Sequence, residues 1–255
     1  MIEPVSTDAG WVGLIDAIRL GWYNQEKLEL APGFPISPDD VVVDVGAGEG
    51  GMAQFCAKVA ARTILVEPDP DKVARAVAEL KAKGAERVEG VVGDAACLPL
   101  PDAFASRVIC AEVLEHVDDP ALAMAELARI GRPGALYMIA APAPVSERLQ
   151  QNIAPQLYFE KPHHIRIFEE GELARLAEDA GLEVESERGL GFYWTMWWLF
   201  YWKSGYQIDS TSHPLLDAWA RTWGLLLAVE GGEQIKAALD ALAPKTVAIV
   251  ARKPL

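Results

Sequence analysis

Residues 41–51 carry glycines at a spacing that could hold a nucleotide-like cofactor. They read Val-Val-Val-Asp-Val-Gly-Ala-Gly-Glu-Gly-Gly, so a run of β-branched residues breaks into a turn, and a helix-compatible segment follows at residues 52–61. A buried strand, a tight turn and a helix N-terminus in this order are where α/β proteins bind such cofactors. The glycines permit backbone angles that other residues avoid and let a ligand approach the main chain.

The charge of this turn distinguishes two kinds of ligand. The spacing fits both the dinucleotide pattern, Gly46-x-Gly48-x-x-Gly51, and the pattern of S-adenosylmethionine (SAM) sites, Asp44-x-Gly46-x-Gly48-x-Gly50. Glu49 lies inside the turn and would repel a pyrophosphate. SAM has no phosphate, and its ammonium and sulfonium groups tolerate nearby carboxylates. The turn therefore favours SAM, and an NAD(P)-dependent oxidoreductase stays the alternative.

Acidic residues follow the next two predicted strands. Residues 63–67 read as a second buried strand that ends at Glu67, and residues 87–92 read as a third strand shortly before Asp94. A carboxylate at the end of the second strand could accept both hydroxyl protons of a ribose, although NAD sites use the same device. Asp94 could accept a hydrogen bond from the amino group of an adenine.

A fourth predicted strand, residues 106–111, runs into the sequence Glu-Val-Leu-Glu-His-Val. With this motif the chain resembles the class I SAM-dependent methyltransferases, especially the small-molecule branch that includes the quinone-biosynthesis enzymes. The residues that carry the resemblance lie in the expected order within residues 39–190 and are Asp44 to Gly50, Glu67, Gly93 to Ala95 and Val113 to Val117.

The resemblance implies an α/β fold with a Rossmann-like, seven-stranded, mainly parallel sheet and helices on both faces. It implies SAM as the cofactor and S-adenosyl-L-homocysteine as the product. The positions that would hold the cofactor are, by this resemblance, Gly46, Gly48 and Gly50 with Asp44 for the methionine part, Glu67 for the ribose, and Asp94 with Ala95 for the adenine.

We predict four segments along the chain. They are an N-terminal helical segment (1–40), a cofactor-binding core (41–189), a tryptophan-rich helical insertion (190–245) and the last strand of the core (246–255). Helices are predicted at residues 10–30, 71–83, 120–130 and 169–180, and further strands at 135–140, 182–188 and 246–252. Residues 141–168 read as a long connection, and such long loops are usually functional.

The insertion departs from the family, in which a short hairpin commonly joins the last two strands. An aromatic stripe at helical spacing runs through Trp194, Trp197, Trp198, Tyr201 and Trp202, and residues 215–229 read as a second helix. The insertion could pack on the sheet edge or on a second subunit, giving a homodimer. It could also be a cap that lines a pocket for an apolar or aromatic acceptor, with Trp194, Trp197, Trp198 and Tyr158 as lining residues. The two interpretations are compatible.

Three histidines are candidates for a general base. His163 and His164 lie late in the long connection, and His116 follows the fourth strand. Each could take the proton from a hydroxyl as that hydroxyl attacks the methyl group. These histidines, with Glu112 and Glu115, lack ligand spacing such as His-x-x-x-His, so we expect no metal site.

Composition narrows the partners. The chain has 255 residues, 51% of them hydrophobic, and a net charge of −14, which argues against nucleic acid because such binding depends on Lys and Arg. Its three cysteines are scattered, which suggests reduced thiols and a cytoplasmic location. Residues 1–10 do not resemble a signal peptide, and no stretch reaches the roughly 18 apolar residues of a membrane span.

The sequence thus predicts a SAM-dependent methyltransferase acting on a small, apolar or aromatic molecule by in-line displacement. Since the sulfonium already activates the methyl group, the protein mainly aligns the two reactants and excludes water. A hydroxyl acceptor is favoured. A SAM-binding partner protein without activity is the other alternative, and it would use the insertion as a docking surface.

Overall fold

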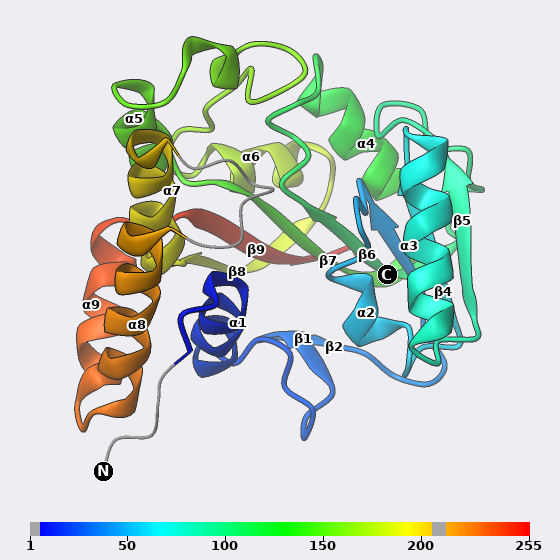
Figure 1. The fold of residues 1–255 in the computed structure, drawn as a ribbon. Coiled ribbons are helices and arrows are strands. Elements are labelled where there is room, and N and C mark those ends of the chain that lie inside the picture. Colours follow the sequence, from blue (N-terminus) through cyan, green and yellow to red (C-terminus); the bar gives the residue numbers. More distant parts are fainter. Residues whose placement is uncertain (1–5, 206–212) are drawn as a thin grey trace.

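A computed structural model describes residues 6–205 and 213–255, which fold around one seven-stranded sheet (Figure 1). Its strands are, in spatial order, β5 (Val88–Val92), β4 (Arg62–Glu67), β3 (Val41–Val45), β6 (Ala105–Ala111), β7 (Gly131–Pro142), β9 (Thr246–Arg252) and β8 (Glu183–Leu190). Strands β3 to β7 pair in parallel, whereas β9 is antiparallel to both β7 and β8. The predicted seven-stranded, mainly parallel α/β fold is confirmed.

The central strands are apolar because both faces of the sheet are covered. In β3, four of the five residues are buried. Val43 and Val45 contribute to the core on one face, and Val42 contributes to the core on the other. Alternate side chains of a strand point to opposite faces, so a continuous run of valines is what a doubly covered parallel strand requires.

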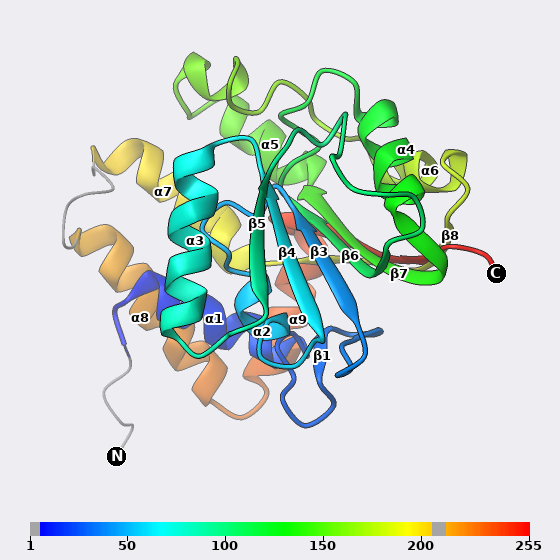
Figure 2. The same cartoon turned by 90° about the vertical axis from the view of Figure 1, so that its right-hand side faces the viewer.

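Helices cover the two faces of the sheet (Figure 2). One face packs against α4 (Pro120–Ile130) and α6 (Glu172–Asp179), and part of the other packs against α2 (Ala53–Cys56) and α3 (Pro70–Ala82). Local sequence signals fix where α3 and α4 begin. Asp69 and Asp119 each accept hydrogen bonds from two backbone N–H groups, and a proline follows each of these caps. None of the described helices has the length and apolarity that crossing a bilayer requires.

The helix predicted at residues 10–30 is too long. The structure has α1 (Ala9–Arg19), and the chain then turns at Gly21, whose φ is 87°, into a short hairpin of β1 (Glu29–Ala31) and β2 (Phe34–Pro35). Apolar residues such as Trp22 and Leu30 continue the helical spacing, but they pack on the sheet through the hairpin. The apolar spacing therefore indicates correctly that these residues are buried, but the hairpin buries them and not a longer helix.

Two other segments also differ from prediction. Residues 52–61 were expected to form a helix, but α2 is one short turn. The connection at residues 141–168 contains α5 (Pro144–Gln151) and the short 3₁₀ helix η1 (Gln156–Phe159). Three buried polar residues of α5 (Ser146, Glu147 and Gln150) lie on its inner face, so the pattern of apolar side chains does not indicate this helix.

The described part of the insertion forms three helices between β8 and β9: α7 (Phe192–Ser204), α8 (Pro214–Ala228) and α9 (Gly232–Leu242). The first two were predicted, and α9 was not. The chain reverses between α8 and α9 at Gly231, which has φ of 77°, and at Gly232, where a Cβ would collide with the Leu226 carbonyl. Residues 206–212 of the insertion, and residues 1–5 of the N-terminal segment, lie outside the described residues.

The N-terminal helix and the insertion form a single helical unit, visible beside the sheet in Figure 1. Val12 of α1, Tyr193 of α7 and Trp223 of α8 belong to one buried cluster. Gly13 allows the closest approach, because a Cβ there would collide with the Trp194 ring. We call α1, α7, α8 and α9 together the helical cap.

A buried polar network also joins the cap helices. Asp16 of α1 accepts a hydrogen bond from Trp223 Nε1 at 2.6 Å and forms an ion pair with Lys236 Nζ at 2.8 Å. Lys236 pairs in turn with Asp240, four residues further along α9, at 2.7 Å. The lysine is only 2% exposed, so these two aspartates supply the charge that makes its burial tolerable.

Candidate cofactor and acceptor site

The glycine turn after β3 has the backbone that its sequence predicts. Gly46, Gly48 and Gly50 have φ angles of 70°, 51° and 75°, which side chains rarely adopt. Gly46 must also lack a side chain because a Cβ would collide with Val113. At Gly48 no atom lies within 4 Å of the Cβ position, so this part of the turn is open to a ligand.

Glu67, the last residue of β4, is held against the same turn. Its Oε2 accepts a hydrogen bond from the Gly48 N–H at 3.1 Å, and the residue is 7% exposed. The carboxylate is therefore oriented before any ligand arrives. Because β3 and β4 are adjacent and parallel, the turn and Glu67 meet at the carboxyl edge of the sheet.

Asp44 lies beneath the turn and has an incomplete hydrogen-bond set. The residue is 3% exposed, and its Oδ2 has no partner among the described residues. Burial raises the pKa of Asp44 to about 7, with a smaller contribution from the charge of Glu67, whereas a hydrogen bond from the Ala53 backbone opposes the rise. A buried carboxylate with a free oxygen is suited to a cationic ligand.

Asp94 and Ala95 follow β5 at the same edge. Asp94 is exposed, and its Oδ1 accepts from the Ala96 N–H at 2.7 Å, so the side chain closes a local turn. Ala95 is buried. Strands β3, β4 and β5 are consecutive in the sheet, and their carboxyl ends thus bring all seven predicted cofactor residues to one edge.

A cavity of about 330 Å³ lies between this edge and the helical cap. Its walls come from α1 and the turn that follows it, from Met52 after the glycine turn, from the ends of the central strands and from α7; the polar groups among them include Asp16, Glu112 and Thr246. Trp194 lines this cavity, whereas Trp197, Trp198 and Tyr158 do not. A second cavity, of about 320 Å³, lies between β7, α6 and α9, and residues 46–51 of the glycine turn line neither cavity.

Glu112 and Tyr23, both in the cavity lining, have an unusual left-handed backbone. Glu112 directly follows β6 and has φ of 55°, a left-handed conformation that is uncommon for a glutamate. Its Oε1 accepts from Thr246 Oγ1 at 3.0 Å, and its Oε2 lies 3.6 Å from Lys245 Nζ. Such strain persists where the surrounding structure requires it and is frequent at functional sites.

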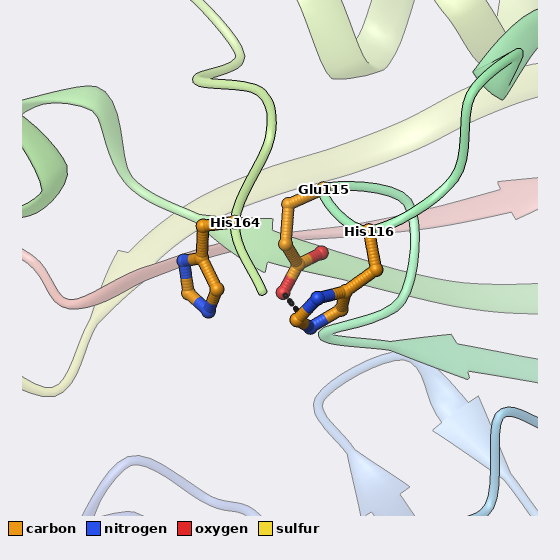
Figure 3. A group of neighbouring side chains, drawn as sticks. All are labelled: Glu115, His116 and His164. Carbon is orange, nitrogen blue, oxygen red and sulfur yellow. Dashed lines mark ion pairs between the residues drawn. The ribbon is translucent and has the colours of Figure 1, made fainter. Parts of the chain in front are cut away.

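The histidines separate into two groups. His116 and His164 lie together, with ring centroids 5.0 Å apart, and Glu115 lies beside them (Figure 3). His163 is exposed and is outside this group. Burial lowers the pKa of His116 and raises the pKa of Glu115 well above its usual range. None of the three histidines lines the cavity beneath the cap.

The expectation of no metal site depended on sequence spacing, and the fold removes that basis. One potential ligand atom from each of Glu115, His116 and His164 lies within 4.8 Å of the others. The first two residues follow β6, and His164 comes from the connection after η1. Only the tertiary structure brings them together.

A family model described as a methyltransferase domain matches residues 22–187. The chain belongs to this methyltransferase family. The matched part begins after α1 and ends within β8, so it contains the glycine turn, Glu67, Asp94 and the histidine group. The helical cap lies outside it.

Individual proteins show the same likeness. A probable S-adenosylmethionine-dependent methyltransferase of Mycolicibacterium smegmatis is 34% identical over 149 residues, which are 58% of this chain and 54% of that protein. The ubiquinone/menaquinone biosynthesis C-methyltransferase UbiE of Caulobacter vibrioides is 33% identical over 109 residues, 40% of this chain and 43% of that protein. Other relatives are named as N- or O-methyltransferases. The chain spans about half the length of the curated relatives it matches.

Solved structures share the fold. The [4+2]-cyclase SpnF has a TM-score of 0.58 and 19% sequence identity, and the match covers 86% of this chain and 77% of that one. At this level of identity the likeness shows the architecture alone. A cyclase on the same architecture illustrates that the reaction has to be argued from the site.

The residues of the carboxyl edge fit SAM, the cofactor that the family implies. The free oxygen of Asp44, the open side of Gly48 and the oriented carboxylate of Glu67 together form a cradle with acceptors for a cation and for hydroxyl groups. One arginine, Arg75, lies beside the turn, and its Nη2 is 3.7 Å from Oε1 of Glu49, with which it pairs.

Some site residues were not identified from the sequence. Tyr23, Met52 and Thr246 line the cavity, and Glu112 was considered only as a metal ligand. Glu112 could have been found, because a polar residue directly after a parallel strand lies at the ligand-binding edge. Met52 and Thr246 lie in segments that were predicted, at the start of α2 and of β9, but that they face one cavity follows only from the tertiary structure.

Proposed function

We propose that this chain is a SAM-dependent methyltransferase whose acceptor is a small, apolar molecule bound beneath the helical cap. The observation that carries the proposal is the cavity of about 330 Å³ between the cap and the carboxyl edge. It extends from Met52, next to the glycine turn, to Trp194 of α7. Apolar walls with a few polar groups are typical of small-molecule sites.

We infer the cofactor contacts from the positions of the edge residues. The glycine turn and Asp44 would hold the methionine part, since the ammonium group is the cation that the Asp44 carboxylate can pair with. Glu67 would accept from the ribose hydroxyls, because its orientation is set by the Gly48 N–H. Asp94 and Ala95 would contact the adenine.

Glu112 is the residue that we propose as the proton acceptor for a hydroxyl substrate. When bound, SAM supplies an activated methyl group, and the protein has to orient the acceptor oxygen and remove its proton. Glu112 lines the cavity, and Thr246 and Lys245 fix its carboxylate. The hydroxyl proton would pass to Glu112 as the oxygen forms its bond to the methyl carbon and the carbon–sulfur bond breaks. Glu112 thus takes the role first considered for the three histidines.

The test supplies methyl-deuterated SAM to the purified chain with a cell extract separated into organic and aqueous fractions. Mass spectrometry then detects newly labelled products. We expect label in the organic fraction, lost in Trp194→Ala and kept in Trp198→Ala, a matched tryptophan of α7 that does not line the cavity. Label only in the aqueous fraction would contradict an apolar acceptor.

A chain that binds SAM but labels nothing in any extract would instead support the SAM-binding partner protein.

Where a labelled product forms, its fragmentation in the mass spectrometer identifies the acceptor atom. In a purified assay, Glu112→Gln should lower kcat by roughly 10²- to 10⁴-fold for a hydroxyl acceptor with little change in KM for SAM. With a nitrogen or carbon acceptor, Glu112→Gln would not show this fall in kcat at a nearly constant KM for SAM. That result would contradict O-methylation.

A further inference from the structure

Glu115, His116 and His164 form a compact group of one carboxylate and two imidazoles (Figure 3). The carboxylate is fully buried, and both of its oxygens lack a hydrogen-bond partner among the described residues. A buried carboxylate without partners is costly, and native structures rarely contain one. The group therefore calls for a cation at Glu115.

The hydrogen bonds of His116 leave the right nitrogen free. Its Nδ1 lies 2.9 Å from the His163 carbonyl and 3.1 Å from the Pro162 carbonyl, and because carbonyls only accept, Nδ1 carries the proton. In the neutral ring Nε2 then holds a lone pair. This Nε2 faces Glu115 Oε1 across 3.7 Å, too far for a hydrogen bond.

His164 is oriented in the same way by a different partner. Its Nδ1 lies 2.8 Å from Oε2 of Glu147, a fully buried carboxylate, so Nδ1 donates there. Its Nε2 is left as an acceptor and takes only a long hydrogen bond, 3.3 Å, from the Tyr158 hydroxyl. A carboxylate that holds the second nitrogen of a histidine is the usual support of a metal-binding imidazole.

The charges around the group are unbalanced. Lys245 lies 3.6 Å from Glu112 and 3.7 Å from Glu147, so one cation serves two carboxylates. Glu115 is a third carboxyl group, and the basic atom that faces it, His116 Nε2 at 3.7 Å, carries no charge in the neutral ring. A divalent cation would correct this excess of negative charge.

We propose that Glu115, His116 and His164 bind a divalent transition-metal ion, with Zn²⁺ the ion best suited to them. Imidazole with carboxylate favours zinc and its neighbours over Mg²⁺, which prefers oxygen ligands. Zinc bonds of about 2.1 Å place tetrahedral ligands about 3.4 Å apart, so the group, now within 4.8 Å, closes slightly around the ion. Three protein ligands leave one position open to water or a small ligand, and the proposal holds whatever the methyl acceptor is.

The test is zinc binding to the tag-free, chelator-treated full chain by calorimetric titration, with MgCl₂ as the comparison ion. His116→Gln and His164→Gln each remove one ligand. His163→Gln is the matched control, because that exposed histidine contributes only its backbone carbonyl to the group. We expect the wild type and the control to bind one Zn²⁺ at least 100-fold more tightly than either ligand variant. Zinc should raise Tm in the first two only.

Equal zinc affinity in all four proteins, no saturable binding in the wild type, or Mg²⁺ binding as tight as that of Zn²⁺ would overturn the proposal. Circular dichroism identifies a variant that fails to fold, and the remaining ligand variant then decides. Glu115→Gln provides a third. It keeps the size of the side chain and removes the charge that the ion would neutralise.

Discussion

Asp44 shows how strongly its surroundings alter the chemistry of one residue. Beneath the glycine turn, burial raises the pKa of this carboxyl from 3.8 to about 7. Between these two pH values the folded chain keeps a proton that the unfolded chain releases. The contribution of Asp44 to the free energy of unfolding therefore decreases as pH rises from about 4 to 7.

Asp44→Asn should remove that pH dependence. The amide does not ionise, so the variant gains stability relative to the wild type as pH rises, by an amount of the order of 4 kcal/mol at pH 8. Urea unfolding of the cofactor-free chain between pH 4 and 8 measures the effect. Asp94→Asn, at an exposed carboxyl on the same edge of the sheet, is the matched control for replacing an acid by its amide. If wild-type stability instead rises over this pH range and Asp44→Asn abolishes the rise, the raised pKa of Asp44 is contradicted.

Glu112 stores conformational strain where the proposed chemistry takes place. Its φ of 55° costs a side-chain-bearing residue about 1 kcal/mol, whereas glycine adopts it freely. Glu112→Ala and Glu112→Gly both remove the carboxylate, but only alanine keeps the strain. The glycine variant should therefore be more stable than the alanine variant by about 1 kcal/mol in chemical denaturation. Equal stabilities would indicate that the backbone relaxes once the carboxylate is gone.

At the scale of elements, the contact between α1 and α7 depends on a missing side chain. A Cβ at Gly13 would collide with the Trp194 ring. We expect Gly13→Ala to destabilise the chain by about 1–3 kcal/mol, as overpacking does. Gly10→Ala on the same helix is the control, because its Cβ has ordinary contacts. If Trp194→Ala in the Gly13→Ala background restores no stability in a double-mutant cycle, the loss has another cause.

The elements that the sequence predicts well are those with a local signal. Residues 120–130 and 246–252 coincide with α4 and β9, since a cap, a proline or a β-branched run marks their limits. Local signals fail where distant segments decide: Trp22 continues a helical pattern but is buried by the hairpin. Likewise, the lone pairs of His116 and His164 are directed by hydrogen bonds across the fold, which no spacing reveals.

At the scale of the whole molecule, two ion pairs join α1 to α9 with very different burial. Lys236 binds Asp16 at 2.8 Å inside the cap, and Arg19 binds Glu233 at 2.7 Å on the surface, with side chains 46% and 65% exposed. Lys236→Met should cost about 3–5 kcal/mol, because it leaves Asp16 and Asp240 buried without their cation.

The surface pair is a matched control for that substitution. Arg19→Met likewise removes one positive charge from an ion pair between α1 and α9. Solvent screening should limit its cost in the free energy of unfolding to less than about 1 kcal/mol. Thermal and urea unfolding of both variants measure the difference. Similar costs for the two would show that the cap is not organised by its buried network.

The helical cap lies outside the part of the chain that matches the family model. The family match, at residues 22–187, contains the turn to which we assign the methyl donor, whereas α1 and α7 lie outside it and contribute walls of the cavity to which we assign the acceptor. On the proposed function, we expect substitutions in these two helices to change what is methylated while leaving the donor site intact. Relatives that share the matched part can then diverge in substrate without losing their common chemistry, and resemblance between donor sites carries no information about the molecule that receives the methyl group.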